Sequence, residues 1–299
     1  MKLGIIGHIS IDTIESNNST VSLGGPPCYS GMAAKHLGAD VDIITRFGPD
    51  LSDDHVFWIS ENQLRIQDGS KSMTSPTTRF RIRLGNKSKQ LYLLSRCDNI
   101  STDQLNMLDE DGIIVSPIVD EIPTTLNRDI SMMNAISLLD PQGYLRSFDQ
   151  NGLCKAQLRQ IKDLPKTNII KLSKEEAFTL TGDDDFIKTL SKFTSSGFEI
   201  VVGTNGSKDV IVLNEERVHR LDIPPNENNG DTTGLGDIFN GTFLTTYLRD
   251  GDVLWATSLA IAIASSCTRS TGISKISLEN HKNYTLIANK IMGNAIRIS

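Results

Sequence analysis

Short apolar segments of five or six residues recur along this chain and are the feature that most constrains its fold. Gly, Pro or Asp bounds many of them, and stretches with a helical apolar period separate them. Strands that are apolar on both faces belong to parallel sheets that helices cover on each side. The sequence therefore predicts an α/β fold with a doubly wound, mainly parallel sheet flanked by helices. The segments begin at Leu3, Val41, Gly112, Ala135, Asn168 and Glu199.

Three helices follow from the same patterns. Pro26 and Pro27 open the first, and Gly38 ends it. Apolar residues between 239 and 248 form one face of the second. The apolar stretch 253–268 is shorter than the roughly 20 residues that a bilayer crossing needs, so we expect a buried core helix there.

Residues 77–94 break the α/β pattern, because apolar and basic residues alternate there before a Gly85-Asn86 turn. A period of two with one polar face indicates an antiparallel hairpin. We assign residues 13–22 and 72–98 to a small β lid inserted in a single α/β domain spanning 1–299. The basic residues are assigned to a solvated face, to the turn and to solubility: Arg79, Arg81, Arg83, Lys87 and Lys89.

Composition excludes several classes of function. Thirty Lys plus Arg face 36 Asp plus Glu, and the net charge of −6 gives no basic surface for nucleic acid or an anionic membrane. The cysteines are far apart, which indicates neither a disulfide framework nor a zinc site, and we expect a cytoplasmic protein. They are Cys28, Cys97, Cys154 and Cys267.

The most informative stretch for chemistry is 228–251, where small residues and two carboxylates precede an amphipathic helix. Gly234 and Gly236 let the backbone N–H groups of residues 234–237 converge at a helix N-terminus, which suits a phosphate oxygen. Asp237 would lie beside that anion site as a candidate general base. An Asp in a first turn is also favoured by the helix dipole alone, so this motif by itself leaves both interpretations open.

Residues 231–237 read DTTGLGD and are followed by Phe239, Gly241 and Phe243. This pattern resembles the second signature of the ribokinase-like (PfkB) carbohydrate kinases, D-T-x-G-A-G-D, with Leu235 in place of the usual Ala. Further resemblance runs in family order from about residue 2 to residue 272. It includes GIIGHISID, SLGGPPCYSGMAAKHLG, LLDPQGYLR, KLSKEEAFTLTG and VVGTNGSKDVIVL.

The resemblance implies transfer of the γ-phosphoryl group of ATP to an alcohol. Asp237 would be the general base, and the backbone of Gly234, Leu235 and Gly236 would be the anion hole. Mg²⁺ would arrive with ATP, and Glu176 would orient it indirectly, although Glu176 also suits a capping box. The nucleotide-binding residues implied are Ser173, Thr204, Gly206, Asp231, Thr232, Gly234 and Gly236, with the adenine near residues 260–272.

Acceptor binding is implied for Asp12, Gly24, Gly25, Tyr29 and Asp237. By the apolar period, Asp12 is expected to follow a buried strand. Asp140, Gln142 and Arg146 are expected to face the cleft. Ribokinases of the family usually carry a sugar-binding Asn at the position of Tyr29. A ribose specificity is therefore in doubt, and the inositol kinase-like branch fits better.

The leading hypothesis is thus an ATP-dependent kinase acting on a sugar, a cyclitol or a related small alcohol. A nucleoside kinase of the same family is an alternative. A catalytically silent sugar or nucleotide sensor is another, because Ser173, Asp209 and Leu235 depart from the family pattern. The absence of a G-x-G-x-x-G fingerprint after the first strand disfavours an oxidoreductase. The specific alcohol, a homodimer through the lid and a monovalent cation near Asp231 stay open.

Overall fold

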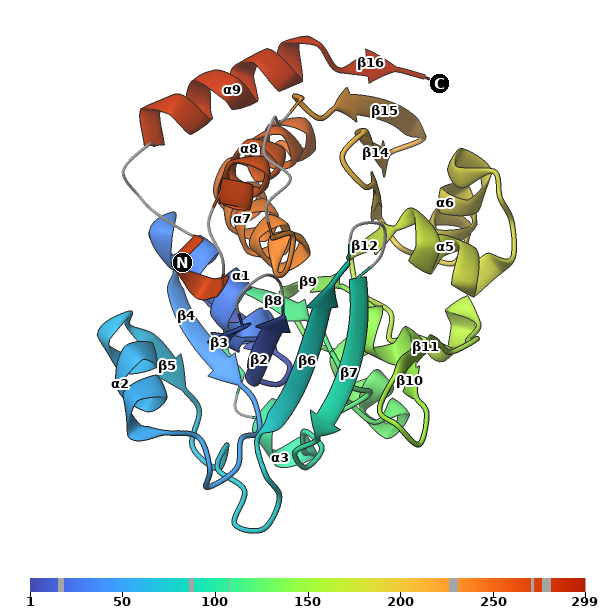
Figure 1. Cartoon of the computed structure of the whole chain (residues 1–299). Helices are drawn as coiled ribbons and strands as arrows, with labels where there is room; N and C mark the ends of the chain where they lie inside the picture. The colour runs from blue at the N-terminus through green and yellow to red at the C-terminus, as the bar shows by residue number, and fades with distance from the viewer. Residues whose placement is uncertain are drawn as a thin grey trace.

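The computed structural model describes residues 1–15, 19–85, 89–106, 108–225, 231–269, 272–275 and 281–298 (Figure 1). Within these residues, ten strands form one large sheet, and the seven from β13 to β5 pair in parallel. In spatial order the strands are β16 (Ile296–Arg297), β15 (Arg217–Asp222), β14 (Asp209–Asn214), β13 (Ile200–Asn205), β12 (Ile169–Ser173), β9 (Ile136–Leu139), β8 (Gly112–Val115), β1 (Lys2–Ile6), β4 (Asp40–Ile44) and β5 (Leu64–Ile66).

Helices cover both faces of this sheet, which confirms the predicted α/β architecture. Successive strand residues feed two apolar cores, as Ile169 and Ile170 of β12 do. The first core contains α1 (Pro26–His36), α7 (Leu235–Asp250) and α8 (Val253–Ser266), with α9 (His281–Gly293) packed on α8. The second contains α3 (Thr102–Leu105), α4 (Asn127–Ser131), α5 (Lys174–Thr181) and α6 (Phe186–Ser195). Helix α2 (Asp53–Glu61) packs beside β5.

The three helices expected from sequence are present. Helix α1 has prolines at its first positions, and Gly38 follows its end with a φ of 88°. Helix α8 is the apolar stretch predicted to be buried, and most of its residues lie in the first core. Across the described residues, no helix combines the length and the apolar character needed to cross a membrane.

A second, four-stranded sheet lies against the large one (Figure 1). Its order is β3 (Ser19–Gly24), β2 (Ser10–Glu15), β6 (Thr78–Leu84) and β7 (Lys89–Ser95). Strands β6 and β7 form the predicted antiparallel hairpin, and β2 pairs with β6 in parallel. Phe80 and Ile82 of β6 are buried against Ile118 and Val119, which follow β8. The alternation of apolar and basic residues in the sequence therefore matches one buried and one polar face of β6. The chain also forms a short pair, β10 (Arg146–Phe148) with β11 (Cys154–Ala156).

Two details differ from the sequence interpretation or lie beyond the described residues. Asp12 was expected after a buried strand, but it lies within β2, paired with Ser22 and Phe80. The second sheet begins only three residues after β1 ends, and the sequence shows no break there. Asn86 of the expected turn and Lys87 fall outside the described residues.

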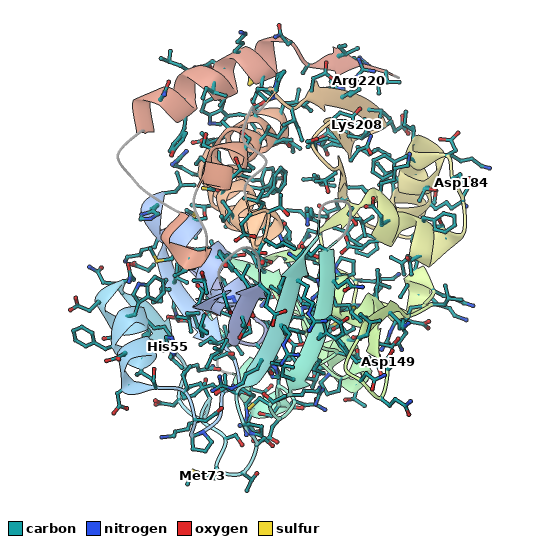
Figure 2. The ribbon with its side chains drawn as sticks, in the orientation of Figure 1. His55, Met73, Asp149, Asp184, Lys208 and Arg220 are labelled. Carbon is teal, nitrogen blue, oxygen red and sulfur yellow. The ribbon has the colours of Figure 1, made fainter. Side chains whose placement is uncertain are left out.

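The outline of the molecule carries polar and isolated apolar side chains (Figure 2). Asp184, before α6, projects at its edge, whereas His55 on α2 and Lys208 after β13 lie within the outline in this view. Met73, in the loop before β6, is 84% exposed but stands alone at the tip of that loop. Single exposed apolar residues of this kind are ordinary and do not by themselves indicate a binding site.

Candidate active site

The N-terminus of α7 lies between two pockets at the carboxyl end of the large parallel sheet, where ligands of such folds bind. We call them the inter-sheet pocket and the helix-side pocket. The inter-sheet pocket has a volume of about 100 Å³ and is lined by Ser10, Asp12, Gly25, Pro26, Tyr29, Phe80, Ile82, Lys89, Leu91, Ile118, Gln142, Arg146, Thr233, Gly234 and Asp237. The helix-side pocket has a volume of about 680 Å³ and is lined by Lys171, Thr204, Gly206, Ser207, Val210, Ile223, Pro224, Pro225, Thr232, Leu235, Gly236, Phe239, Ile261, Ala264, Ser265 and Thr268.

The segment 232–237 is a wall between the two pockets. Thr232, Leu235 and Gly236 line the helix-side pocket. Thr233, Gly234 and Asp237 line the inter-sheet pocket. The unpaired N–H groups of a helix N-terminus favour an anion, and here that terminus stands where the pockets meet.

The shape of this wall depends on Gly234. Its φ of 76° is left-handed, and a Cβ there would lie 2.6 Å from the ring of Tyr29. Asp231 is buried and accepts the N–H of Thr233 at 2.8 Å and that of Gly272 at 3.4 Å. Asp231 and Thr232 therefore shape the loop as expected, although Asp231 is not among the described residues that line either pocket.

Asp237 is buried in the first turn of α7. Burial, and then the charge of Asp140, raises the pKa of Asp237 to about 7, although Lys171 and Arg146 oppose the rise. A carboxylate with a pKa near neutrality can accept a proton and release it again, as a general base must. Asp237 lies in the first turn of α7, beside the helix N-terminus, where the sequence predicted the general-base candidate.

A buried ion pair lies behind the wall. Lys171 of β12 donates to Asp140 across 2.9 Å, and Asn240 of α7 donates to the same carboxylate oxygen at 2.8 Å. Although burial favours the neutral amine, Asp140 and Glu176 raise the pKa of Lys171, so it stays charged. Its ammonium lies beside Gly236, where a Cβ would be 2.9 Å away. The pair therefore places a positive charge next to the helix N-terminus.

Sequence reasoning missed Lys171. Lys171 lies inside the apolar run NIIKLS, which is interpreted from sequence simply as a buried strand. A lysine in a strand buried on both faces was the available signal, because an unpaired charge is costly there.

In the inter-sheet pocket, Asp12 is 4% exposed and accepts a hydrogen bond from the Ser10 hydroxyl at 2.8 Å. Burial raises the pKa of Asp12 to about 6, although the Ser10 hydrogen bond and the charge of Lys89 lower it. Gly24 packs directly against this carboxylate without lining the pocket, while Gly25 lines it. A carboxylate so placed can accept hydroxyl hydrogen bonds.

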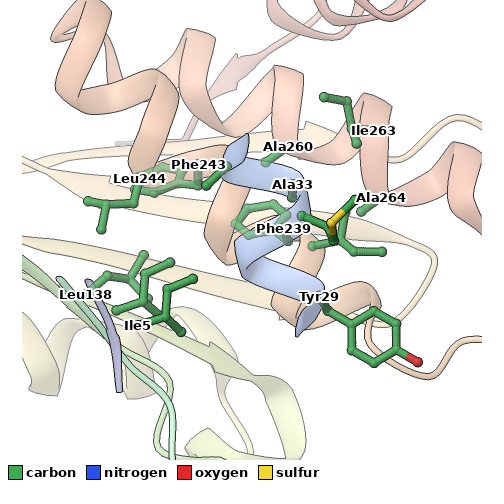
Figure 3. Close-up of a cluster of buried hydrophobic side chains, with 14 of the residues drawn as sticks. Ile5, Tyr29, Ala33, Leu138, Phe239, Phe243, Leu244, Ala260, Ile263 and Ala264 are labelled. Atoms are coloured by element: carbon green, nitrogen blue, oxygen red, sulfur yellow. The ribbon is translucent and has the colours of Figure 1, made fainter. Parts of the chain in front are cut away.

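Tyr29 also lines the inter-sheet pocket. The residue is 1% exposed, and its hydroxyl is buried without a hydrogen-bond partner among the described residues. Figure 3 shows this hydroxyl directed away from the labelled apolar cluster that contains Phe239 and Ala33. A buried hydroxyl is normally hydrogen-bonded, so this one is a candidate ligand contact.

Gln142 and Arg146, from the segment after β9, complete this side of the pocket. Gln142 Nε2 lies 3.3 Å from Asp237 Oδ1, and Arg146 Nη2 donates to Gln142 Oε1 at 2.6 Å. These residues face the cleft as the sequence predicted. The side chain of the general-base candidate therefore has a neutral donor beside it.

Lys89 corrects the sequence interpretation. It was assigned to the turn and to solubility, but its ammonium donates to Thr233 Oγ1 at 3.0 Å and it lines the inter-sheet pocket. These two residues are 144 positions apart, and only the placement of the second sheet on the wall joins them. The neighbouring arginines follow the expectation: Arg79 pairs with Asp50, and Arg81 and Arg83 pair with Glu15.

On the helix-side pocket, Thr204 at the end of β13 and Gly206 in the next turn both line the cavity as expected. The 260–272 region contributes Ile261, Ala264, Ser265 and Thr268. Apolar side chains thus meet a polar loop and a cationic amine in one cavity.

Ser173 and Glu176 make a reciprocal capping box at the start of α5. The Ser173 hydroxyl accepts the Glu176 N–H at 3.2 Å, and Glu176 Oε2 accepts the Ser173 N–H at 2.7 Å. Burial, and then Asp140, raises the pKa of Glu176, although Lys171 lowers it. Neither residue lines either pocket within the described part of the chain. Their observed role is to end β12 and begin α5 behind Lys171.

The model of the pfkB family of carbohydrate kinases matches residues 6–280. No curated protein sequence matches the chain significantly.

Solved structures show the same fold. A pyrophosphate-dependent myo-inositol-1 kinase converted into a myo-inositol-3 kinase by two substitutions is 23% identical, with a TM-score of 0.78 over 94% of this chain and 99% of that one. Arabidopsis thaliana ribokinase complexed with ribose and ATP is 18% identical, with a TM-score of 0.73 over 96% and 98%. Vibrio cholerae O395 fructokinase with fructose, ADP and calcium is 16% identical, with a TM-score of 0.76 over 96% and 98%.

Proposed function

We propose a function for this chain, which belongs to the pfkB family of carbohydrate kinases. It transfers the γ-phosphoryl group of ATP from the helix-side pocket to a hydroxyl group of a small polyol in the inter-sheet pocket. The observation that carries this proposal is the wall 232–237, which presents a helix N-terminus between the pockets and a carboxyl with a pKa of about 7 to one of them.

Support for a nucleotide donor comes from the helix-side pocket. Its volume of about 680 Å³ is within the usual range for small-molecule sites, roughly 300–1,000 Å³. Val210, Ile223 and Ile261 give it an apolar section that suits a nucleobase. Pyrophosphate, the donor named for three structural neighbours, has no apolar part to fill that section. Lys171 and the N–H groups at Gly234 and Gly236 would hold the phosphates.

Support for a polyol acceptor comes from the inter-sheet pocket. Asp12 and the Tyr29 hydroxyl offer hydrogen bonds to hydroxyl groups, and Lys89 and Arg146 offer donors. The side chain of Tyr29 stands where ribokinases of the family usually carry an Asn. A cyclitol or a sugar other than ribose is therefore the acceptor class that we propose.

In the reaction, Asp237 accepts a hydrogen bond from one acceptor hydroxyl and takes its proton. The oxygen forms a bond to the γ-phosphorus as the bond to the β-phosphate oxygen breaks, and ADP leaves with that electron pair. The N–H groups at the start of α7 stabilise the negative charge on the phosphoryl oxygens. Positioning and charge stabilisation supply most of the acceleration in such transfers.

We also propose that a Mg²⁺ ion arrives with ATP. None of their His, Cys, Asp and Glu side chains form a cluster of three or more that could hold a metal. Mg²⁺ usually keeps several waters and needs few protein ligands when phosphates bind it. Glu176 would orient those waters from behind Lys171. When bound, the ion would neutralise charge on the phosphate oxygens.

We also propose that the second sheet is a lid within a single domain. The inter-sheet pocket, at about 100 Å³, is smaller than an ordinary ligand site. Movement of β6 and β7 would admit the acceptor and then exclude water around it. Pairing of two lids in a homodimer, a monovalent cation near Asp231 and a cytoplasmic location stay predictions.

The test is release of ADP with Mg²⁺ and ATP across inositols, pentoses, hexoses, ketodeoxy sugar acids and nucleosides. A parallel series with pyrophosphate measures phosphate release instead. Saturable ADP release with one polyol class, and little phosphate release from pyrophosphate, is the expected result. Turnover with pyrophosphate alone would contradict the nucleotide donor, and turnover with nucleosides alone would favour the nucleoside kinase.

A catalytically silent sensor is the remaining candidate, favoured by the departures at Ser173, Asp209 and Leu235. Calorimetry with ATP and each polyol separates it from a kinase. Binding of both ligands without release of ADP would establish the sensor.

A further inference from the structure

The half-buried amide of Gln142 contacts the general-base candidate directly. We infer that Gln142, held by Arg146, is a positioning residue that fixes which oxygen of Asp237 receives the acceptor proton and keeps that carboxyl ionised. This inference rests on the proposed function, in which Asp237 is the base.

The geometry begins with the segment after β9. Gln142 opens a 3-10 helix, Gln142–Leu145, and its backbone N–H lies 3.3 Å from Asp140 Oδ1. Its side-chain Nε2 lies 3.3 Å from Asp237 Oδ1 and 3.5 Å from Ser116 Oγ. The amide therefore bridges the end of the large sheet to the first turn of α7.

The orientation of this amide follows from its two charged neighbours. Arg146 can only donate hydrogen bonds, so the Gln142 atom 2.6 Å from its Nη2 must be the amide oxygen. Arg146 Nη1 also donates to the Ile118 carbonyl at 3.2 Å, which fixes the guanidinium in place. The amide nitrogen is thereby turned toward Asp237, whose ionised carboxylate can only accept.

A consequence for proton transfer follows. Gln142 Nε2 has no lone pair to offer, so it stabilises Asp237 Oδ1 only while that oxygen carries no proton. The proton from the acceptor hydroxyl must then go to Oδ2. One carboxylate oxygen serves orientation, and the other serves the reaction.

Other charged groups around Asp237 also shift its pKa, in opposite directions. Asp140, after β9, and Asp12, on β2, disfavour its ionisation, whereas Lys171, on β12, and Arg146 favour it. Cys28 and Tyr29 face it from α1, and their own pKa values are raised, so both stay neutral. Because burial raises the pKa of Asp237 to about 7, loss of one donor changes the fraction that is ionised near neutral pH.

The first experiment measures the pKa of Asp237 in the unliganded protein by ¹³C NMR of its carboxyl carbon, assigned with D237N. In Gln142→Leu we expect this pKa to rise by about one pH unit, the size of a lost hydrogen bond to a charged group. The acid limb of kcat/KM should move upward by the same amount, because activity is lost as pH falls through the pKa of the base. Gln104→Leu is the matched control, because Gln104 is a buried amide that donates to the Thr45 carbonyl instead. We expect no shift of either quantity there.

Two further variants distinguish the loss of this hydrogen bond from a general disturbance of the structure. Gln142→Glu keeps the size of the side chain and turns a second carboxyl toward Asp237, so the pKa should rise further than in Gln142→Leu. Arg146→Lys keeps the positive charge but loses the planar fork that orients the amide, so a smaller rise is expected. An unchanged pKa of Asp237 in both Gln142 variants would overturn the inference.

The NMR pKa needs no turnover, which separates this inference from the proposed function. A raised pKa in Gln142→Leu, in a protein that transfers no phosphoryl group, would contradict the kinase and leave the positioning role intact. Turnover with an unchanged pKa would contradict the positioning role alone.

Discussion

The inter-sheet pocket and the helix-side pocket share one wall but are built in different ways. The helix-side pocket lies on the large sheet and its helices, with a volume of about 680 Å³. The inter-sheet pocket, at about 100 Å³, is closed by Lys89 and Leu91 from the second sheet. Under the proposed function, donor binding would depend on a preformed site, whereas acceptor binding would depend on where the second sheet lies. Substitutions can therefore separate the two.

The largest effect is expected at Lys171, which lines the helix-side pocket and pairs with Asp140. Lys171→Met leaves the Asp140 carboxylate buried without its cation, and breaking a buried pair costs about 3–5 kcal/mol of unfolding free energy. Denaturant unfolding should show that loss, and ATP affinity should fall with it. The double variant Asp140→Asn with Lys171→Met should recover part of the stability. Unfolding of Lys171→Met at the wild-type midpoint would show that the pair contributes nothing.

Gly234→Ala comes next and should damage the wall that the pockets share. A left-handed backbone costs an Ala about 1–2 kcal/mol, and the new Cβ would lie 2.6 Å from the Tyr29 ring. We expect kcat to fall at least about tenfold, since the helix N-terminus must shift. Gly251→Ala is the control, because Gly251 has a φ of 68° with nothing within 4 Å of such a Cβ. Equal losses of stability in the two variants would contradict the role of the Tyr29 contact.

Asp12→Asn should affect the inter-sheet pocket alone. Loss of a charged hydrogen-bond acceptor for the polyol should raise the acceptor KM by about tenfold or more. The dissociation constant of ATP, measured by calorimetry, should stay at the wild-type value. Asp50→Asn is the control, because it removes a carboxylate that forms an exposed ion pair with Arg79. This variant should change neither the acceptor KM nor the dissociation constant of ATP. A weaker affinity for ATP in Asp12→Asn would mean that the pockets are not independent.

The smallest effect is expected at Lys89. Its ammonium is partly exposed and donates a hydrogen bond to Thr233. Because exposed charged contacts contribute little energy, Lys89→Met should raise the acceptor KM only a few-fold. Arg83→Met removes the same charge from the outer face of the same sheet and should leave KM unchanged. If both variants behave alike, overall charge rather than the position of Lys89 is responsible.

The same comparison explains what the sequence could predict. The wall 232–237 was predictable because Gly234, Gly236 and Asp237 lie within four successive residues, and a helix N-terminus is a local feature. Six of the seven parallel strands were predictable because each has its own apolar run, whereas the three-residue strand β5, which reads LRI, has none.

The parts that sequence reasoning missed depend on tertiary placement. Lys89 faces Thr233 only because the second sheet lies over the wall. Glu176 satisfies its capping box, a role that local pattern also allowed. Lys171 was missed because its partner Asp140 is 31 residues away in the sequence and follows β9, the strand next to β12 in the sheet. Local patterns specify elements and caps, whereas ion pairs across the sheet depend on how those elements are arranged.

The most direct test of the central claim is the rate of ADP formation by Asp237→Asn, compared with the wild type, with Mg²⁺, ATP and the best acceptor. The account predicts a loss of about 10²-fold or more, since that is what a positioned general base contributes. Calorimetry should show unchanged ATP binding in the same variant. Turnover near the wild-type rate would contradict the assignment of Asp237 as the base between the two pockets.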